Sequence, residues 1–146
     1  MTYDLVKFLR ARLDEDEELR RGARTWTDRD WQVITSPRDD RVTVMDEANV
    51  IAWTELDGEP GQRIAAHIVR YDPARTRIDI EAKRLIIAAH HRSGATCPRC
   101  SLGTEDGQVV FELDPCDTLR LLALPYRDHP DYQPAWVPST PATPPA

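Results

Sequence analysis

Residues 90–116 contain the pattern that decides the fold: His90-His91, then Cys97-Pro98-Arg99-Cys100, then Asp114-Pro115-Cys116. The stretch holds all three cysteines of the chain and two of its four histidines. Two thiols separated by two residues can converge on one metal ion, because the turn between them is tight. A third thiol and one imidazole complete the four-coordinate site that Zn²⁺ prefers. The pattern therefore predicts a structural zinc site formed by His90, Cys97, Cys100 and Cys116.

The fourth ligand is the open position in this prediction. We favour His90 over His91, because His90 follows Ile86 by four residues on the expected buried side of a helix. The alternative is that three reduced cysteines pack close together, with both histidines on the surface at a fraying helix end. An iron–sulfur cluster is disfavoured, since it ordinarily requires four cysteines.

Length and composition indicate one domain with an ordinary hydrophobic core. The chain has 146 residues, of which 40% are hydrophobic and 30% charged, as in typical globular proteins. No apolar run approaches the roughly 18 residues that span a bilayer, and the first residues lack the pattern of a secretory signal. We therefore expect a cytoplasmic protein without membrane contact, in which an odd number of reduced thiols suits metal binding better than disulfides.

Charge is arranged in three blocks. Residues 1–60 carry 15 acidic and 9 basic side chains, residues 61–99 carry 3 and 8, and residues 100–146 carry 7 and 2. The basic segment 61–99 could bind phosphate or an acidic partner, but its side chains can equally pair with the acidic blocks of the same molecule. We favour internal pairing, and the net charge of −6 makes nucleic-acid binding an unfavoured alternative.

Hydrophobic periodicity predicts an α+β fold. It indicates an amphipathic N-terminal helix over residues 3–21 and a small antiparallel β-meander of strands 31–35, 42–45 and 50–55, with Trp26, Trp31 and Trp53 at its core and rim. A short helix is expected around residues 64–69. Asp72 and Pro73 then mark the start of a longer helix ending near His91, whose buried face comprises Ile78, Ala82, Leu85, Ile86 and Ala89.

The C-terminal half is expected to be mainly helical around a zinc-knuckle-like site. A strand over residues 109–111 leads towards Cys116, and a final helix begins at Cys116 or Asp117 and ends at Pro125. We expect His67 to serve packing or hydrogen bonding and His129 to lie in a turn. The predicted organisation is a single α+β domain over residues 1–136, followed by a disordered proline-rich tail over residues 137–146.

The chain also resembles a family of unknown function that is found in actinobacteria and their phages (domain of unknown function family 6221). The most specific motif is Thr118-Leu119-Arg120-Leu121-Leu122-Ala123-Leu124-Pro125-Tyr126, followed by residues 128–132. Residues 4–17, 66–75 and 81–84 are similar to the family as well. The family tends to have a histidine where this chain has His90. The chain differs from the family at residues 23–26, where the family tends to have a Pro-Gly-Pro turn before the tryptophan. The resemblance implies a setting in a phage or mobile element, but no activity.

Three classes of function follow. We favour a small, non-enzymatic accessory or binding protein with a structural zinc ion and an unknown protein partner. The alternative is a nucleic-acid-associated regulator that uses the basic segment 61–99. An enzyme is disfavoured: Cys97-Pro98-Arg99-Cys100 resembles part of a zinc deaminase motif, but His90-His91-Arg92 lacks the glutamate that such enzymes need as acid and base. We therefore assign no catalytic residues and no cofactor other than zinc.

Overall fold

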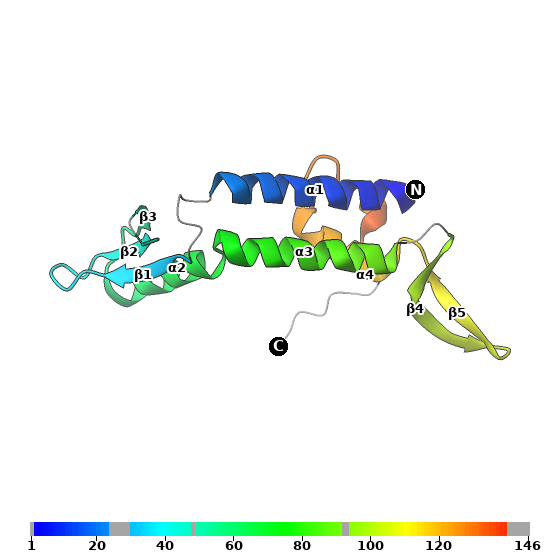
Figure 1. Ribbon diagram of the computed structural model, residues 1–146. Helices are drawn as coiled ribbons and strands as arrows, with labels where there is room; N and C mark the ends of the chain where they lie inside the picture. The colour runs from blue at the N-terminus through cyan, green and yellow to red at the C-terminus, as the bar shows by residue number, and fades with distance from the viewer. Residues whose placement is uncertain (1, 24–29, 48, 92–93, 140–146) are drawn as a thin grey trace. The chain divides into compact units, whose positions relative to one another are not determined.

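The computed structural model describes residues 2–23, 30–47, 49–91 and 94–139. The chain forms two small sheets, and helices precede, separate and follow them in the sequence (Figure 1). The elements are α1 (Thr2–Gly22), β1 (Gln32–Thr35), β2 (Val42–Met45), β3 (Val50–Trp53), α2 (Gly58–Arg70), α3 (Pro73–His90), β4 (Thr96–Glu105), β5 (Gln108–Leu113), α4 (Asp117–Ala123), and the 3₁₀ turns η1 (Leu124–Tyr126) and η2 (Pro134–Trp136). The predicted α+β class, with an N-terminal helix and a three-stranded meander, is confirmed.

The chain divides into two compact units. One comprises Met1–Glu15 together with Glu81–Ala146, and the other comprises Asp16–Ile80. The single domain over residues 1–136 stays a prediction, and only the first three residues of the expected tail, 137–139, are described. Within the described ranges, no helix is both long enough and apolar enough to cross a membrane.

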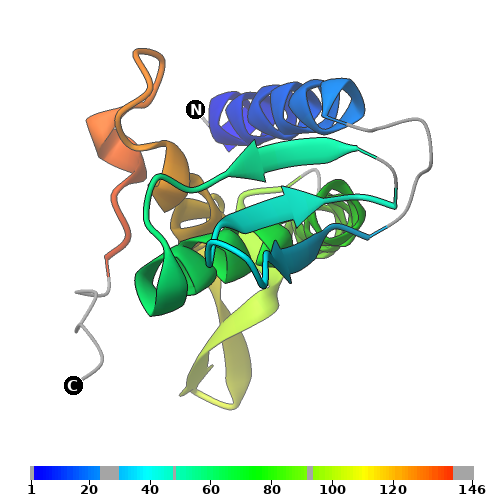
Figure 2. The ribbon, with the colours of Figure 1, turned by 90° about the vertical axis from the view of Figure 1, so that its left-hand side faces the viewer.

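The meander in the unit Asp16–Ile80 is antiparallel, with strand order β1-β2-β3. Val42 and Val44 on the central strand are fully buried and pack with Ala65 of α2. Because side chains alternate along a strand, these residues place one face of the sheet against α2 (Figure 2). The strands end close to their predicted bounds, although β3 stops at Trp53.

The structure describes two of the three tryptophans that were predicted for this sheet, and these two differ in burial. Trp31 is partly buried and packs against the core cluster, as expected. Trp53 is 66% exposed, so of the two expected positions, core and rim, it does not occupy the core. It pairs with Thr43, whose neighbours Val42 and Val44 point to α2, and the alternation therefore places Trp53 on the opposite face. Trp26 lies outside the described residues.

Helix α2 is longer than predicted, because it begins at Gly58, six residues before the first apolar position of the pattern. Asp57 is its N-cap residue and Pro60 lies in its first turn, where a missing N–H costs nothing. A side chain at Gly61 would place Cβ 1.9 Å from the Leu56 carbonyl oxygen, so this close approach requires glycine. His67 is exposed, and its ring packs against that of Tyr71 with the centroids 5.0 Å apart and the planes tilted by 58°.

Helix α3 begins as predicted, with the Asp72 carboxylate accepting a hydrogen bond from the Arg75 N–H at 2.7 Å. The predicted buried face is wrong: Ile78 and Leu85 are 55% and 71% exposed, whereas Ile80 and Ile87 are 2% and 1% exposed. Apolar residues occur on both sides of this helix, so periodicity alone could not decide between them. The face that is buried also carries His90, three residues after Ile87.

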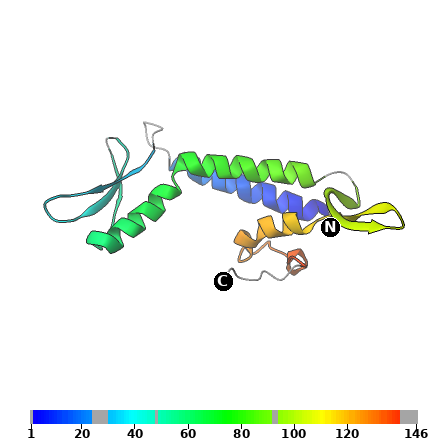
Figure 3. The same cartoon turned by 90° about the horizontal axis from the view of Figure 1, so that it is seen from below.

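Helix α1 supplies much of the core of the other unit. Leu5, Leu9 and Leu13 recur every four residues and are at most 1% exposed. The early turns of α1 lie beside the late turns of α3 (Figures 1 and 3), where Arg84 Nη2 contacts Asp14 Oδ1 at 2.8 Å. Phe8 on the same helix packs against Trp136 at 4.9 Å between ring centroids. The extension after α4 is thereby tied to α1.

Glu17 should make the stability of the protein depend on acidic pH. Hydrogen bonds from Arg20, followed by the charges of Arg20 and Arg21, lower the pKa of Glu17 from 4.5 to about 2. Its stabilising contribution is therefore complete above about pH 4.5 and is lost as the pH falls towards 2. In urea titrations, Glu17→Gln should be less stable than the wild type at pH 7, and this difference should vanish near pH 2. The neighbouring Glu18→Gln is the control. A difference that does not change with pH would contradict this assignment.

Candidate metal centre

Three separate elements bring the predicted metal ligands together. His90 is the last residue of α3, Cys97 and Cys100 lie on β4, and Cys116 immediately precedes α4. These four residues form a group whose ligand atoms all lie within 4.8 Å of one another. The structure thus places all four predicted residues at one point, in the unit that holds the C-terminal half.

A break in the hairpin register forms the turn between the first two cysteines. Strand β4 pairs with β5 at Thr96↔Leu113 and again at Ser101↔Phe111. Residues 97–100 therefore stand opposite Glu112 alone. The three-residue excess on β4 forms a bulge in which both cysteine side chains can turn to the same side of the strand.

The hairpin itself extends beyond the single strand predicted over residues 109–111. Its tip is the pair Asp106 and Gly107, with φ of 47° and 79°, and Glu105 pairs with Gln108 across it. Two positive φ values define a type I′ turn, for which Asp-Gly is a preferred sequence. Asp106-Gly107 is therefore the local sequence signal for β4, a strand that was not predicted.

The third cysteine is fixed by the start of α4. Cys116 occupies the N-cap position after a cis Asp114–Pro115 peptide bond. The Glu112 carboxylate accepts a hydrogen bond from the Asp117 N–H at 2.6 Å. Glu112 is also the residue opposite the 97–100 bulge, so one side chain connects the hairpin to the first turn of α4.

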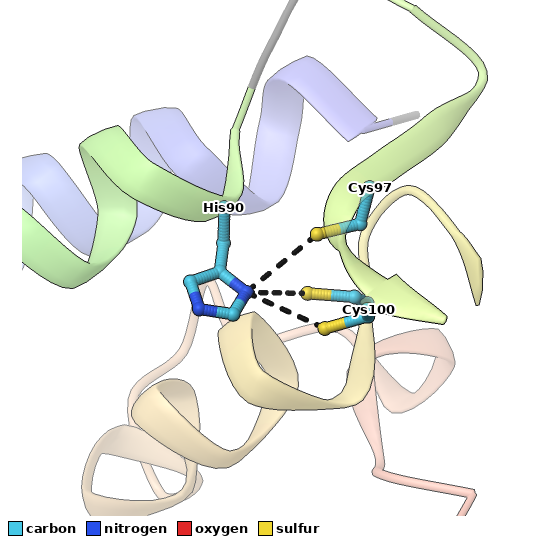
Figure 4. Close-up of side chains that lie close together, drawn as sticks. His90, Cys97 and Cys100 are labelled. Carbon is cyan, nitrogen blue, oxygen red and sulfur yellow. Dashed lines mark hydrogen bonds between the residues drawn. The ribbon is translucent and has the colours of Figure 1, made fainter. Parts of the chain in front are cut away.

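The geometry of the cluster fits a tetrahedral zinc ion. His90 Nδ1 lies 3.6, 3.4 and 3.6 Å from the sulfur atoms of Cys97, Cys100 and Cys116, and the imidazole points at them (Figure 4). A tetrahedron with Zn–S bonds of about 2.3 Å and Zn–N bonds of about 2.0 Å separates nitrogen from sulfur by about 3.5 Å. The observed distances therefore match the edges of such a site.

The three cysteines are free thiols, and two of them are buried. None of the three forms a disulfide, and Cys97 and Cys116 are fully buried. Burial is the main cause that raises the pKa of Cys116 to about 12, and it raises the pKa of Cys100 as well. Thiolates would be unfavourable here without a cation, whereas a divalent metal ion compensates their charge and binds them in the deprotonated form.

His91 lies outside the cluster and has a different neighbour. Its Nδ1 is 3.4 Å from Oδ2 of Asp114, whose side chain is only 1% exposed. Burial raises the pKa of this carboxyl group, while the nearby His91 opposes the shift. The two adjacent histidines therefore differ in their contacts, and His90 is the one that faces the three sulfurs.

A second polar cluster in the same unit was missed from the sequence. Arg12 is 8% exposed, contacts Glu15 at 2.5 Å and hydrogen-bonds to the ring of His129. Its guanidinium also lies over the Phe8 ring, 5.2 Å from the centroid. His129 lies in a turn, as expected, with its N–H donating to the Tyr126 carbonyl at 2.9 Å, and its ring also joins α1 to the C-terminal extension. No local pattern signals a contact between residues 117 positions apart.

One family model matches most of the chain. The family model described as "Family of unknown function (DUF6221)" matches residues 2–138. The chain belongs to this family, which confirms the resemblance seen in its motifs. Searches of curated proteins and of solved structures gave no match.

Proposed function

We propose that this protein is a small, non-enzymatic accessory or binding protein in which His90, Cys97, Cys100 and Cys116 hold one structural zinc ion. The convergence of three sulfur atoms on His90 Nδ1 carries the proposal. Three thiolates and one imidazole suit zinc, which takes four such ligands in structural sites. Four protein ligands leave no position for water or substrate, which is our reason for proposing a role other than catalysis.

Zinc in this position would join parts of the chain that have few other links. The ligands come from the end of α3, the β4–β5 hairpin and the start of α4. Much of the hairpin is exposed, including Leu102 and Leu113 at 69% each. Because metal binding stabilises only the folded arrangement, its free energy contributes directly to folding. A reducing compartment such as the cytoplasm would keep the thiols available, and the family resemblance supports a setting in actinobacteria or their phages.

Native mass spectrometry tests this proposal on the purified full chain. We expect about one zinc ion per chain. Removal of the ion with a chelator should lower the melting temperature, and stoichiometric Zn²⁺ should restore it. Protein that contains no metal and whose melting temperature is the same with and without Zn²⁺ would contradict the proposal.

The alternative is a nucleic-acid-associated regulator that uses the basic segment 61–99. Internal ion pairs weigh against it. Arg63 contacts Glu59 at 2.5 Å, Arg75 contacts Asp79 at 3.5 Å, and Arg84 contacts Asp14 at 2.8 Å. These arginines already have acidic neighbours in the same molecule, which reduces the positive charge offered to phosphate. A salt-dependent gel shift on duplex DNA that is lost in Arg77→Ala/Arg84→Ala would favour the alternative.

A further inference from the structure

The three cysteines of the metal centre differ in their access to solvent. Cys97 and Cys116 are fully buried, whereas Cys100 is only partly buried. A small reagent in solution therefore reaches Cys100 first. Access and thiolate character together decide which cysteine reacts, and a metal ion gives all three sulfurs thiolate character. Access is thus the property that distinguishes Cys100.

Cys100 also has a polar neighbour outside the set of ligands. Its sulfur lies 3.8 Å from Oγ1 of Thr118, in the first turn of α4. A metal-bound thiolate has no proton to give, so the hydroxyl must be the donor. A hydrogen bond to the sulfur withdraws electron density from it and slows its attack on an electrophile. Thr118 therefore moderates the reactivity of Cys100, the partly buried ligand.

We propose that Cys100 is a modification site at which a hydroperoxide oxidises the centre and releases its metal. This inference rests on the proposed zinc function and deepens it. The Cys100 thiolate attacks the terminal oxygen of the hydroperoxide, an S–O bond forms, and the O–O bond breaks. The leaving oxygen takes a proton and departs as water or an alcohol. Sulfur is oxidised to sulfenic acid, and the peroxide is reduced.

Cys97 then completes the reaction. Its thiolate attacks the sulfenic sulfur of Cys100, an S–S bond forms, and the S–O bond breaks. The hydroxide that leaves is protonated to water. The sum is two thiolates, one hydroperoxide and two protons giving one disulfide, one water and one further water or alcohol. Zinc leaves as Zn²⁺ without a change of oxidation state. Cys97 is suited to this step because it lies on the same bulge, with only two residues between it and Cys100, and its sulfur is within 4.8 Å of that of Cys100.

The test uses the full chain as purified, with its zinc content measured before any oxidant is added. One equivalent of hydrogen peroxide is added, a metallochromic dye follows Zn²⁺ release, and a 1,3-dicarbonyl reagent traps sulfenic acid for peptide mapping. We expect the first adduct on Cys100, and a Cys97–Cys100 disulfide in samples without the trap. Thr118→Val keeps all four ligands and should release zinc about fivefold faster, the factor that corresponds to the loss of one net hydrogen bond.

Thr118→Ser is the matched control, because it retains the hydroxyl group and should release zinc at the wild-type rate. First oxidation on Cys97 or Cys116 would overturn the inference, as would equal rates for Thr118→Val and the wild type. A Cys100–Cys116 disulfide would overturn the assignment of the second step. Protein without zinc before oxidant is added would instead refute the proposed function, so the two failures can be distinguished.

Discussion

His90→Ala should purify with little or no zinc and should melt about 10 °C or more below the wild type. Within the described part of the chain, the His90 imidazole supplies the nitrogen that lies 3.4–3.6 Å from all three sulfur atoms. Without it, three sulfurs in a largely buried setting have no fourth protein ligand from the cluster. Loss of a structural zinc ion costs several kcal/mol, and each kcal/mol corresponds to about 2–4 °C in a protein of this size. Elemental analysis and calorimetry on the same samples provide the measurement.

His91→Gln is the matched control for this variant. It changes the adjacent histidine, whose neighbour is Asp114 rather than the cysteines, and glutamine can still donate a hydrogen bond. We expect zinc content to stay at the wild-type level. Retained zinc in His90→Ala together with lost zinc in His91→Gln would mean that the ligand assignment is reversed.

Leu9→Ala should lower the free energy of unfolding by about 2–5 kcal/mol, the range for large-to-small changes in a core. Leu9 is 1% exposed and lies on the leucine stripe of α1. Truncation removes buried apolar area and leaves a cavity, because closely packed surroundings relax only in part. Urea unfolding followed by circular dichroism measures the difference.

Leu19→Ala provides the comparison on the same helix. Leu19 is 75% exposed, so the same chemical change should cost no more than about 0.5 kcal/mol. Equal costs for the two variants would show that the stripe of α1 does not form the core described here. A large cost for Leu9→Ala alone supports the packing of α1 and is independent of the metal.

The cysteine pattern allowed the site to be located from sequence. The short spacing between Cys97 and Cys100 leaves few conformations, and both sulfurs lie in the cluster as expected. Asp72 and Pro73 likewise marked the start of α3, because capping depends on local backbone chemistry. Features that depend on a few neighbouring residues could therefore be predicted from the sequence.

Features that depend on tertiary packing could not be predicted from the sequence in the same way. Helix α3 has apolar residues on two sides, and the neighbours of Ile87, not its periodicity, decide which side is buried. Trp53 has a large apolar side chain, as many core residues do, but lies on the face of the sheet away from α2. The contact of Arg12 with His129 joins opposite ends of the sequence. In each case the deciding partner is distant along the chain.

X-ray absorption at the zinc edge reports the ligands of the metal in the intact protein and therefore shows whether one imidazole and three thiolates hold it. We expect about three sulfur atoms at roughly 2.3 Å and one nitrogen at roughly 2.0 Å. A first shell dominated by oxygen, or the absence of zinc from the folded protein, would contradict this expectation.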